Sequence, residues 1–243
     1  MRSGPRVGLF LAAATALAIV LVRGLADLPE FGHYVGPYGD VIVPLAVGEG
    51  RAIANVATAI VFDHRGFDTL GEEFIFIAGV IGVVVISRWL PTEETRPDPQ
   101  QHVAPLSGVT PYVLIPGLLY GVYTVFSGTI TPGGGFQGGA ILASVLVLMF
   151  LVAEAAALTA VAPKTILERL EGVGVASFIA VGLAGAVLGG AYLANFLPQG
   201  ELGRLASGGT LPLLSAAVGL AVSAGMLVVA HESIEHLERQ RRS

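Results

Sequence analysis

The sequence has no cysteine and few charged residues. None of its 243 residues is Cys, and only 13% are Asp, Glu, Lys or Arg. A disulfide framework, a thiol nucleophile and a thiolate metal site are therefore excluded, and the redox compartment cannot be inferred. The formal net charge of −5 lacks the basic excess typical of nucleic-acid-binding proteins, so we expect no nucleic-acid partner.

Hydrophobic residues are abundant instead. They make up 53% of the chain, and the mean hydropathy is +0.76. Both values are outside the range of soluble globular domains. The sequence therefore predicts an all-α polytopic integral membrane protein, which we place in the plasma membrane as a multi-pass protein.

Six apolar segments are candidates for membrane spans. They are residues 7–22, 74–90, 111–129, 139–161, 172–197 and 211–231. A cleaved signal peptide is a rival for the first, since Gly24 and Ala26 suit a cleavage site, but its length favours a membrane helix. Residues 51–62 have helical periodicity but reach only about 18 Å, against roughly 30 Å of hydrocarbon. We expect them to form a short interfacial or re-entrant helix.

A polar, Pro-rich stretch at residues 91–110 is the predicted linker between two domains. Residues 1–90 then hold two spans, residues 111–236 hold four, and residues 237–243 form a charged tail. Arg and Lys are more frequent in the segments that would be cytoplasmic if both termini faced the cytoplasm. This orientation puts both motifs described next on the outer side.

The first motif, which we call the glycine loop, spans residues 131–139. It consists of Thr131, Pro132, Gly133, Gly134, Gly135, Phe136, Gln137, Gly138 and Gly139. So much glycine argues against a simple continuation of either flanking helix, and favours positive φ or close backbone approach. The loop suits either a tight turn between packed helices or a nest of N–H donors. It is no nucleotide-binding P-loop, because no Gly-Lys-Ser/Thr follows.

The second motif, which we call the acidic block, spans residues 63–73, directly before the second apolar segment. Thr69 or Asp68 suits a helix cap, with Glu72 and Glu73 in the first turn. The alternative is ion or proton handling, because acids at a bilayer boundary commonly mark ion pathways. In that case Arg65 is a possible countercharge for Asp63. The candidate pathway residues are Asp63, Arg65, Asp68, Glu72 and, inside the fourth apolar segment, Glu154.

The glycine loop and its apolar flanks resemble the signature of the B subunit of Mrp-type multisubunit sodium/proton antiporters. The resemblance covers residues 110–235. The acidic block, together with Asn55, resembles a segment in the C-terminal part of the Mrp A subunit, which also occurs as a small subunit of membrane-bound hydrogenases. His64 departs from the aromatic residue expected there. The chain thus resembles that small subunit fused ahead of a B subunit.

The resemblance implies a non-enzymatic subunit of a sodium/proton antiporter complex without a cofactor. Its expected partners are the other subunits, sodium ions, protons and the lipid bilayer, and the whole assembly would serve pH homeostasis. The alternatives are a membrane-arm subunit of an energy-converting hydrogenase or complex I relative, and a purely structural assembly subunit. Glu154 is the one obvious acid inside a span, so we expect this chain to supply part of a pathway and to brace larger subunits.

Residues 231–236 superficially resemble a zinc protease motif. His231 and His236 are five residues apart, about 140° around a helix, and so do not share the face that such a site requires. We therefore expect a solvated helix end.

Overall fold

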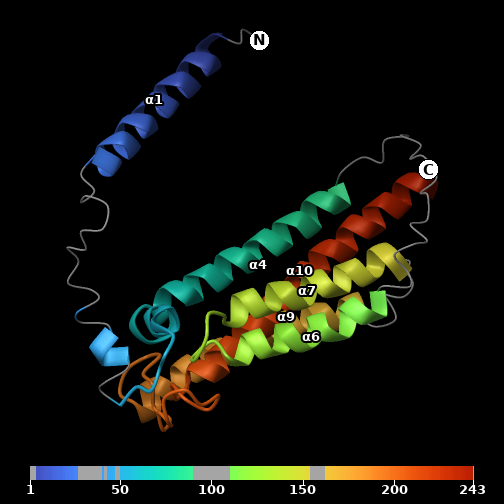
Figure 1. The fold of residues 1–243 in the computed structure, drawn as a ribbon. Coiled ribbons are helices and arrows are strands. Elements are labelled where there is room, and N and C mark those ends of the chain that lie inside the picture. The colour runs from blue at the N-terminus through green and yellow to red at the C-terminus, as the bar shows by residue number, and fades with distance from the viewer. Residues whose placement is uncertain are drawn as a thin grey trace. The chain divides into compact units, whose positions relative to one another are not determined.

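The computed structural model describes residues 4–26, 40, 43–46, 50–89, 110–153 and 162–242. In these ranges the regular elements are all helices, and no strand is present (Figure 1). The chain divides into two compact units, Met1–Val41 and Ile42–Ser243. The first contains α1, Gly4–Ala26, an apolar helix that agrees with the first predicted span. The second contains everything that follows.

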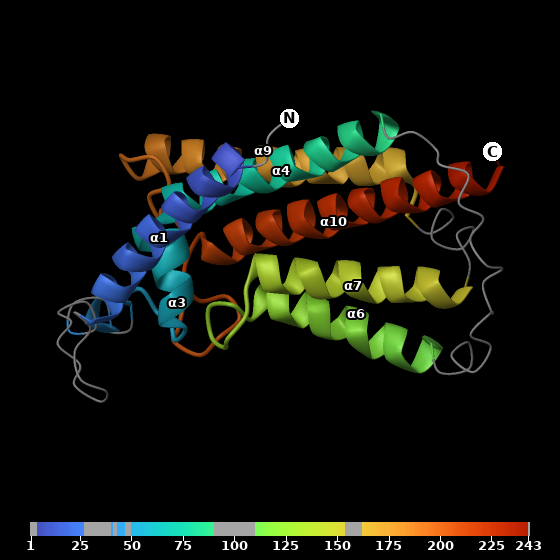
Figure 2. The same cartoon turned by 90° about the horizontal axis from the view of Figure 1, so that it is seen from above.

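Five long helices form the second unit. They are α4 (Gly66–Trp89), α6 (Thr110–Phe126), α7 (Gly135–Ala153), α9 (Lys164–Leu188) and α10 (Leu211–Arg242). Helix α10 lies at the centre of this bundle, between the α4 and α9 side and the α7 and α6 side (Figure 2). Its apolar first half is mostly buried, with Leu214, Val218 and Val222 at 2% exposure or less. All five agree in type with predicted spans, and the prediction of an all-α membrane protein is confirmed.

Small residues explain how closely the helices pack around α10. A Cβ on Gly139 would lie 2.8 Å from the carbonyl oxygen of Gly219, and one on Gly174 would lie 2.7 Å from that of Ala217. Ser215 adds a buried hydrogen bond from its Oγ to the carbonyl oxygen of Val125 on α6, at 2.6 Å. Backbones in contact favour association even in lipid, where apolar burial alone gives little.

Three described helices are long and apolar enough to cross a membrane. They are Gly66–Trp89, Lys164–Leu188 and the Leu211–His236 part of α10, while Tyr112–Phe126 and Gly135–Leu148 are shorter apolar helices. The predicted linker lies mostly outside the described residues, and the domain boundary within it stays a prediction. Helix α4, which we assigned to the first domain, packs against α10 and α9 in the second compact unit.

Both boundaries of α9 differ from the sequence prediction. Helix α9 begins at Lys164, so Glu168, Arg169 and Glu171 are helical and do not lie between spans. It ends at Leu188, because Gly189 and the positive-φ Gly190 stop it nine residues before the predicted end at 197.

The prediction of a short helix at residues 51–62 is only partly correct. Residues 51–55 are not helical; α3 covers Val56–Thr58 and the π-helix η1 covers Ala59–His64. Ile53, Ala59 and Phe62 are buried in one core cluster with Phe178 of α9 and Leu211 of α10. This segment therefore contributes to the protein core, although Ala57 and Val61 stay exposed.

Candidate functional site: a cavity between the two motifs

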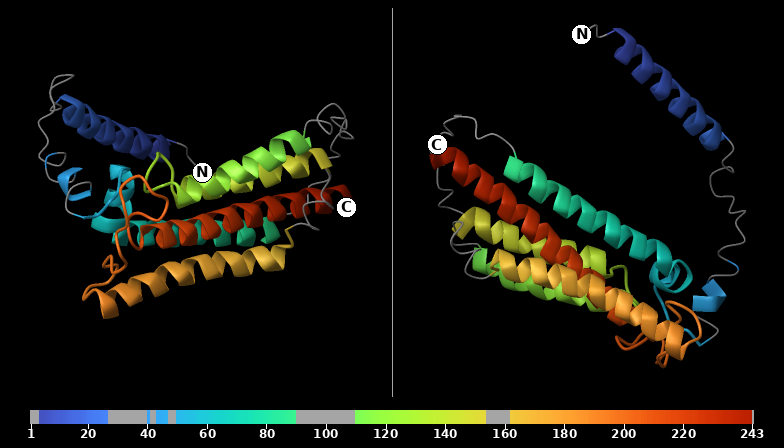
Figure 3. Two further views of the ribbon diagram at one scale, coloured as in Figure 1. Left: turned by 60° about the horizontal axis from the view of Figure 1, so that its bottom comes forward. Right: turned by 180° about the vertical axis from the view of Figure 1, so that it is seen from behind.

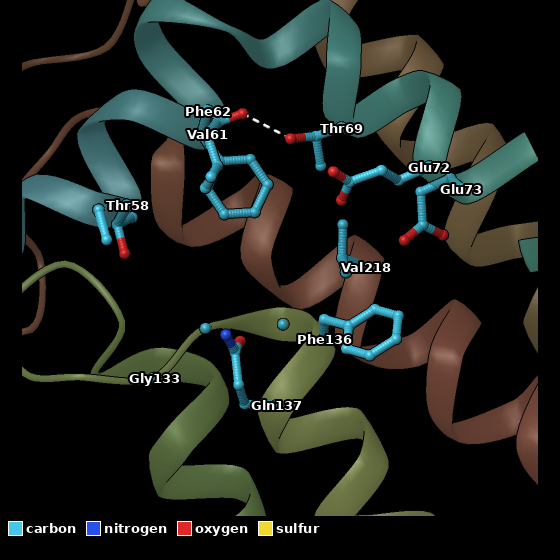
Figure 4. A pocket seen from close by; sticks show the side chains of 13 residues that line it. Thr58, Val61, Phe62, Thr69, Glu72, Glu73, Gly133, Phe136, Gln137 and Val218 are labelled. Atoms are coloured by element: carbon cyan, nitrogen blue, oxygen red, sulfur yellow. Dashed lines mark hydrogen bonds between the residues drawn. The ribbon is translucent and has the colours of Figure 1, made fainter. Parts of the chain in front are cut away.

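The acidic block and the glycine loop line opposite sides of one cavity of about 130 Å³. Thr69, Glu72 and Glu73 of α4 line one side, with residues of α3 and η1 beside them. Residues 133–137 line the other side, and Val218 of α10 contributes as well (Figure 4). Both motifs thus lie at the same end of the bundle, as their predicted common side requires. The membrane face to which that end belongs stays a prediction.

Asn55 joins the two motifs. Its Nδ2 donates to the carbonyl oxygens of Gly128 at 2.8 Å and Thr131 at 2.9 Å, and its Oδ1 accepts from the backbone N–H of Ala57. Thr58 Oγ1 donates to the same Gly128 oxygen at 2.6 Å. The polar residues that interrupt the apolar run at 51–62 therefore attach it to the turn before the glycine loop.

Helix α4 begins at Gly66, earlier than the cap prediction implies. Thr69 and Glu73 are thus helical, and Thr69 Oγ1 donates to the carbonyl oxygen of Val61 in η1 at 2.5 Å. Thr69 is therefore no N-cap, while Asp68 lies in the first turn. The wide turn of η1 closes with a hydrogen bond from the N–H of Arg65 to the oxygen of Ile60. Such π-turns are frequent at functional sites.

The ion pairs of the acidic block differ from the prediction. Asp63 pairs with Arg51, with 3.2 Å between Oδ1 and Nη1, and its side chain is only 4% exposed. Arg65 is no countercharge for Asp63, because it pairs with Asp68 on the surface, at 2.5 Å between Nη2 and Oδ2. Neither residue of that surface pair lines the cavity.

Glu72 and Glu73 are the acids that reach the cavity (Figure 4). Glu72 is exposed, whereas Glu73 is only 2% exposed. Within the described part of the chain, Glu73 Oε2 has no hydrogen-bond partner. Helix α7 begins at Gly135 on the opposite side, and the N-terminal dipole of a helix favours negative charge nearby.

The glycine loop is half loop and half helix. Gly135 to Gly139 form the first turns of α7, so the helix begins four residues before the predicted start at 139 and continues through the second half of the motif. Gly134 has φ of +139°, and its N–H donates to the carbonyl oxygen of Thr124 at 3.0 Å. Gly138 N–H donates to the oxygen of Gly134, so these two donors serve the fold and not a nest for a ligand.

The other glycines of the motif are needed because the backbone of a neighbouring helix approaches them closely, and not because of positive φ. A Cβ on Gly135 would lie 2.2 Å from the oxygen of Ser215 in α10, and one on Gly138 would lie 2.7 Å from the backbone nitrogen of Val125 in α6. Real Cβ atoms do not approach backbone atoms so closely. The motif therefore fixes α7 against both neighbours, which supports the packing interpretation.

Buried acids inside the helices were missed by the sequence reasoning. Glu73 and Glu171 are 2% and 8% exposed, and Glu232 is fully buried. Glu154, the acid predicted there, lies outside the described residues. Each of these acids has polar neighbours in the sequence, and we therefore assigned it to a polar segment at the end of a helix. For Glu171, the available signal was its spacing of seven residues from Lys164, which returns to the same helix face.

The predicted solvated end at residues 231–236 is wrong for its first two residues. His231 Nε2 lies 2.8 Å from the carbonyl oxygen of Ala162, and the side chain is 3% exposed. Glu232 forms ion pairs with Lys164 of α9 and Arg88 of α4. Helix α10, which continues to Arg242, thus places the buried Glu232 among charged partners at the opposite end of α4 from the cavity.

Comparisons with known proteins agree with this architecture. Residues 105–228 match the family described as a domain related to the MnhB subunit of Na+/H+ antiporter. An uncharacterized protein of Methanocaldococcus jannaschii is 31% identical over 203 residues, covering 73% of this chain and 76% of that protein.

Two solved structures are similar over nearly the whole chain. One is a chain of the membrane-bound sulfane sulfur reductase, an archaeal respiratory membrane complex, with TM-score 0.72, 26% identity, and coverage of 94% of this chain and 97% of that one. The other is a chain of the Mrp complex from Dietzia sp. DQ12-45-1b, with TM-score 0.69 and 20% identity, which shows the fold alone. This match covers 93% of our chain and 26% of that longer chain. The chain is a membrane protein of the Mrp type that belongs to the family with a domain related to the MnhB subunit of Na+/H+ antiporters.

Proposed function

We propose that this chain is a subunit of a multisubunit sodium/proton antiporter, in which the cavity takes up cations or protons through Glu72. The observation that carries the proposal is the convergence of both motifs on one cavity whose wall holds Glu72 and the buried Glu73. The proposed role is transport and assembly in the plasma membrane, without enzymatic chemistry. The complete complex would export sodium and maintain internal pH.

The surface supports a chain that works among partners. Large apolar side chains are exposed on helices that belong to the second unit, among them Ile75 of α4, Ile115 and Leu119 of α6, and Val187 of α9. Surfaces of this kind pack against lipid or other subunits. Within a series of polar stations across the bilayer, this chain supplies one portion and the partner subunits the rest.

The test compares Glu72→Gln with Asp68→Asn in the intact complex reconstituted into vesicles. Both changes remove a carboxylate from α4, but only Glu72 lines the cavity. We expect the Glu72 variant to lose most sodium/proton antiport, and the Asp68 variant to retain it. Full antiport by both variants, in normally assembled complexes, would contradict the proposed pathway.

A second candidate is a membrane-arm subunit of a respiratory complex. The match to the archaeal respiratory complex favours it, because that match extends over nearly the full length of both chains. Purifying the tagged chain from its native membranes and identifying its partners by mass spectrometry separates the candidates. Redox subunits would support the respiratory complex, whereas antiporter subunits alone would support the antiporter.

A further inference from the structure

Two buried carboxyl groups lie in the bundle, one in the cavity wall and one on the neighbouring helix α9. Glu73 on α4 and Glu171 on α9 are 2% and 8% exposed. Among the residues that the structure describes, Glu73 Oε2 and Glu171 Oε1 have no hydrogen-bond partner. An unpaired carboxylate in such a place is strongly disfavoured, so each group needs a proton, a cation or a partner.

The two carboxyls belong to one connected region. Glu72 and Glu171 are the charged groups that act electrostatically on Glu73. Both Glu171 and Phe76 lie close to Gly225 of α10. A Cβ on Gly225 would be 2.9 Å from Glu171 Oε1 and 2.6 Å from the ring of Phe76. Phe76 also packs edge-on against Phe136 of the cavity wall, with ring centroids 6.2 Å apart. The region of Glu171 is therefore adjacent to the cavity wall.

Glu171 on α9 and Gly225 on α10, which lie close together, each have a charged residue seven positions away on the same helix. Lys164 lies seven residues before Glu171, and Glu232 lies seven residues after Gly225. Seven residues are two helical turns, or about 10 Å, on one helix face. Lys164 pairs with Glu232, which also contacts Arg88 at 3.3 Å. Of these groups, Glu73, Glu171 and Glu232 are buried, Lys164 is partly buried and Arg88 is exposed. Helices α4, α9 and α10, which carry them, run alongside one another (Figure 3).

A proton suits Glu73 and Glu171 better than a metal cation does. Hard cations require several oxygen ligands, whereas two neighbouring carboxyl groups can share one proton. In the described ranges, no three acidic or histidine side chains come together as a metal site. The other charged groups near the pair are Glu72, which acts on Glu73, and the exposed Glu168, which acts on Glu171. Both are acidic, and both disfavour a second negative charge on the pair.

We propose that Glu73 and Glu171 form an internal proton relay that leads from the cavity into the bundle, toward the Lys164–Glu232–Arg88 cluster. In each transfer the O–H bond on one carboxyl breaks as a new O–H bond forms on the other, and the pair keeps a single negative charge. Glu72 delivers the proton to Glu73 from the cavity. The relay deepens the proposed function and rests on it.

The test uses the intact complex with the full chain in four forms: wild type, Glu73→Gln, Glu171→Gln and the control Glu201→Gln. Glu201 is an exposed acid with a 74% exposed side chain, paired with Arg204 in the loop before α10. Infrared difference spectra before and after deuterium exchange report protonated carboxyl groups directly. We expect a protonated-carboxyl band in wild type and in the control, and its loss or displacement in both relay variants. Proton flux should fall about tenfold or more in those two variants.

Every outcome of this experiment either supports or contradicts the relay. If both relay variants keep the wild-type infrared band and the wild-type proton flux, the relay is overturned. If Glu72→Gln alone loses proton flux, the relay is wrong but the proposed function stands. A change confined to the sodium concentration dependence, with the infrared band unchanged, shows a cation site and also overturns it. If a Gln variant does not assemble, Glu73→Asp keeps a titratable group in its place. Recovery of both band and flux in that variant supports the relay, and their absence in an assembled complex contradicts it.

Discussion

The side-chain nitrogen of Asn55 donates to the carbonyl oxygen of Gly128, 73 residues further along the chain, at 2.8 Å. With the bond to Thr131, this contact joins the segment before the acidic block to the turn before the glycine loop. Residues that resemble two different subunits are therefore joined through this amide group, together with Thr58 Oγ1 and the backbone N–H groups of Ala54 and Asn55. The cavity depends on that connection, because its two walls belong to these two segments.

Replacing Asn55 with alanine should loosen the cavity. The carbonyl oxygen of Thr131 loses the donor from Asn55, and that of Gly128 keeps only Thr58 Oγ1. A buried group left unsatisfied costs about 1–3 kcal/mol. We expect a lower melting temperature of the purified complex and a lower yield from membranes. His64→Ala, an exposed change on neighbouring η1, should have little effect on either. Equal stability of the two variants would show that the bonds of Asn55 contribute nothing measurable.

Alanine at Gly138 should prevent correct packing of α7. Its Cβ would lie 2.4 Å from Cγ2 and 2.7 Å from the backbone nitrogen of Val125. The matched control is Gly172→Ala in α9, where no heavy atom lies within 4 Å of the new Cβ. That control should be neutral or stabilising by up to about 1 kcal/mol, since alanine favours helix. The amount of intact complex extracted from membranes measures both, and equal recovery would contradict the packing argument.

The two ion pairs of the acidic block should differ in their contribution to stability. Arg51→Gln leaves the Asp63 side chain, 4% exposed, without its countercharge, which we expect to destabilise the protein by about 1–3 kcal/mol. Asp68→Asn breaks a pair whose side chains are 71% and 52% exposed, and should cost at most about 1 kcal/mol. Thermal unfolding of the two variants gives the comparison. The reverse order would mean that the surface pair holds the start of α4.

Reporter fusions test the membrane topology. Helix α4 ends at Trp89 near the Glu232 cluster, while α9 ends at Leu188 at the cavity end. Fusions at Thr95 and Gly200 should therefore report opposite sides, with Thr95 cytoplasmic. Activity of both reporters on one side would contradict the six-span arrangement.

The sequence predicted the helices well and the site only in part. Long apolar runs determine spans almost by themselves, so all described long helices match predicted segments. The pairing of Arg65 with Asp68 and not with Asp63 was not predictable, because it depends on how η1 turns the chain before α4. Glu171 was assigned to a loop because charged neighbours precede it, and only the packing of α9 on α10 shows that it is buried.

The close packing of α7 on α10 limits how the cavity can open. Gly135 and Gly139 bring the two backbones into direct contact, so α7 cannot slide or roll on α10 without a steric clash. That wall is stiff. The opposite wall includes η1, where a π-turn can convert to an α-turn by shifting one residue in register. Widening of this cavity is therefore sterically easier on the side of the acidic block, where a register shift within η1 would re-aim the side chains of Val61 and Phe62 that line it.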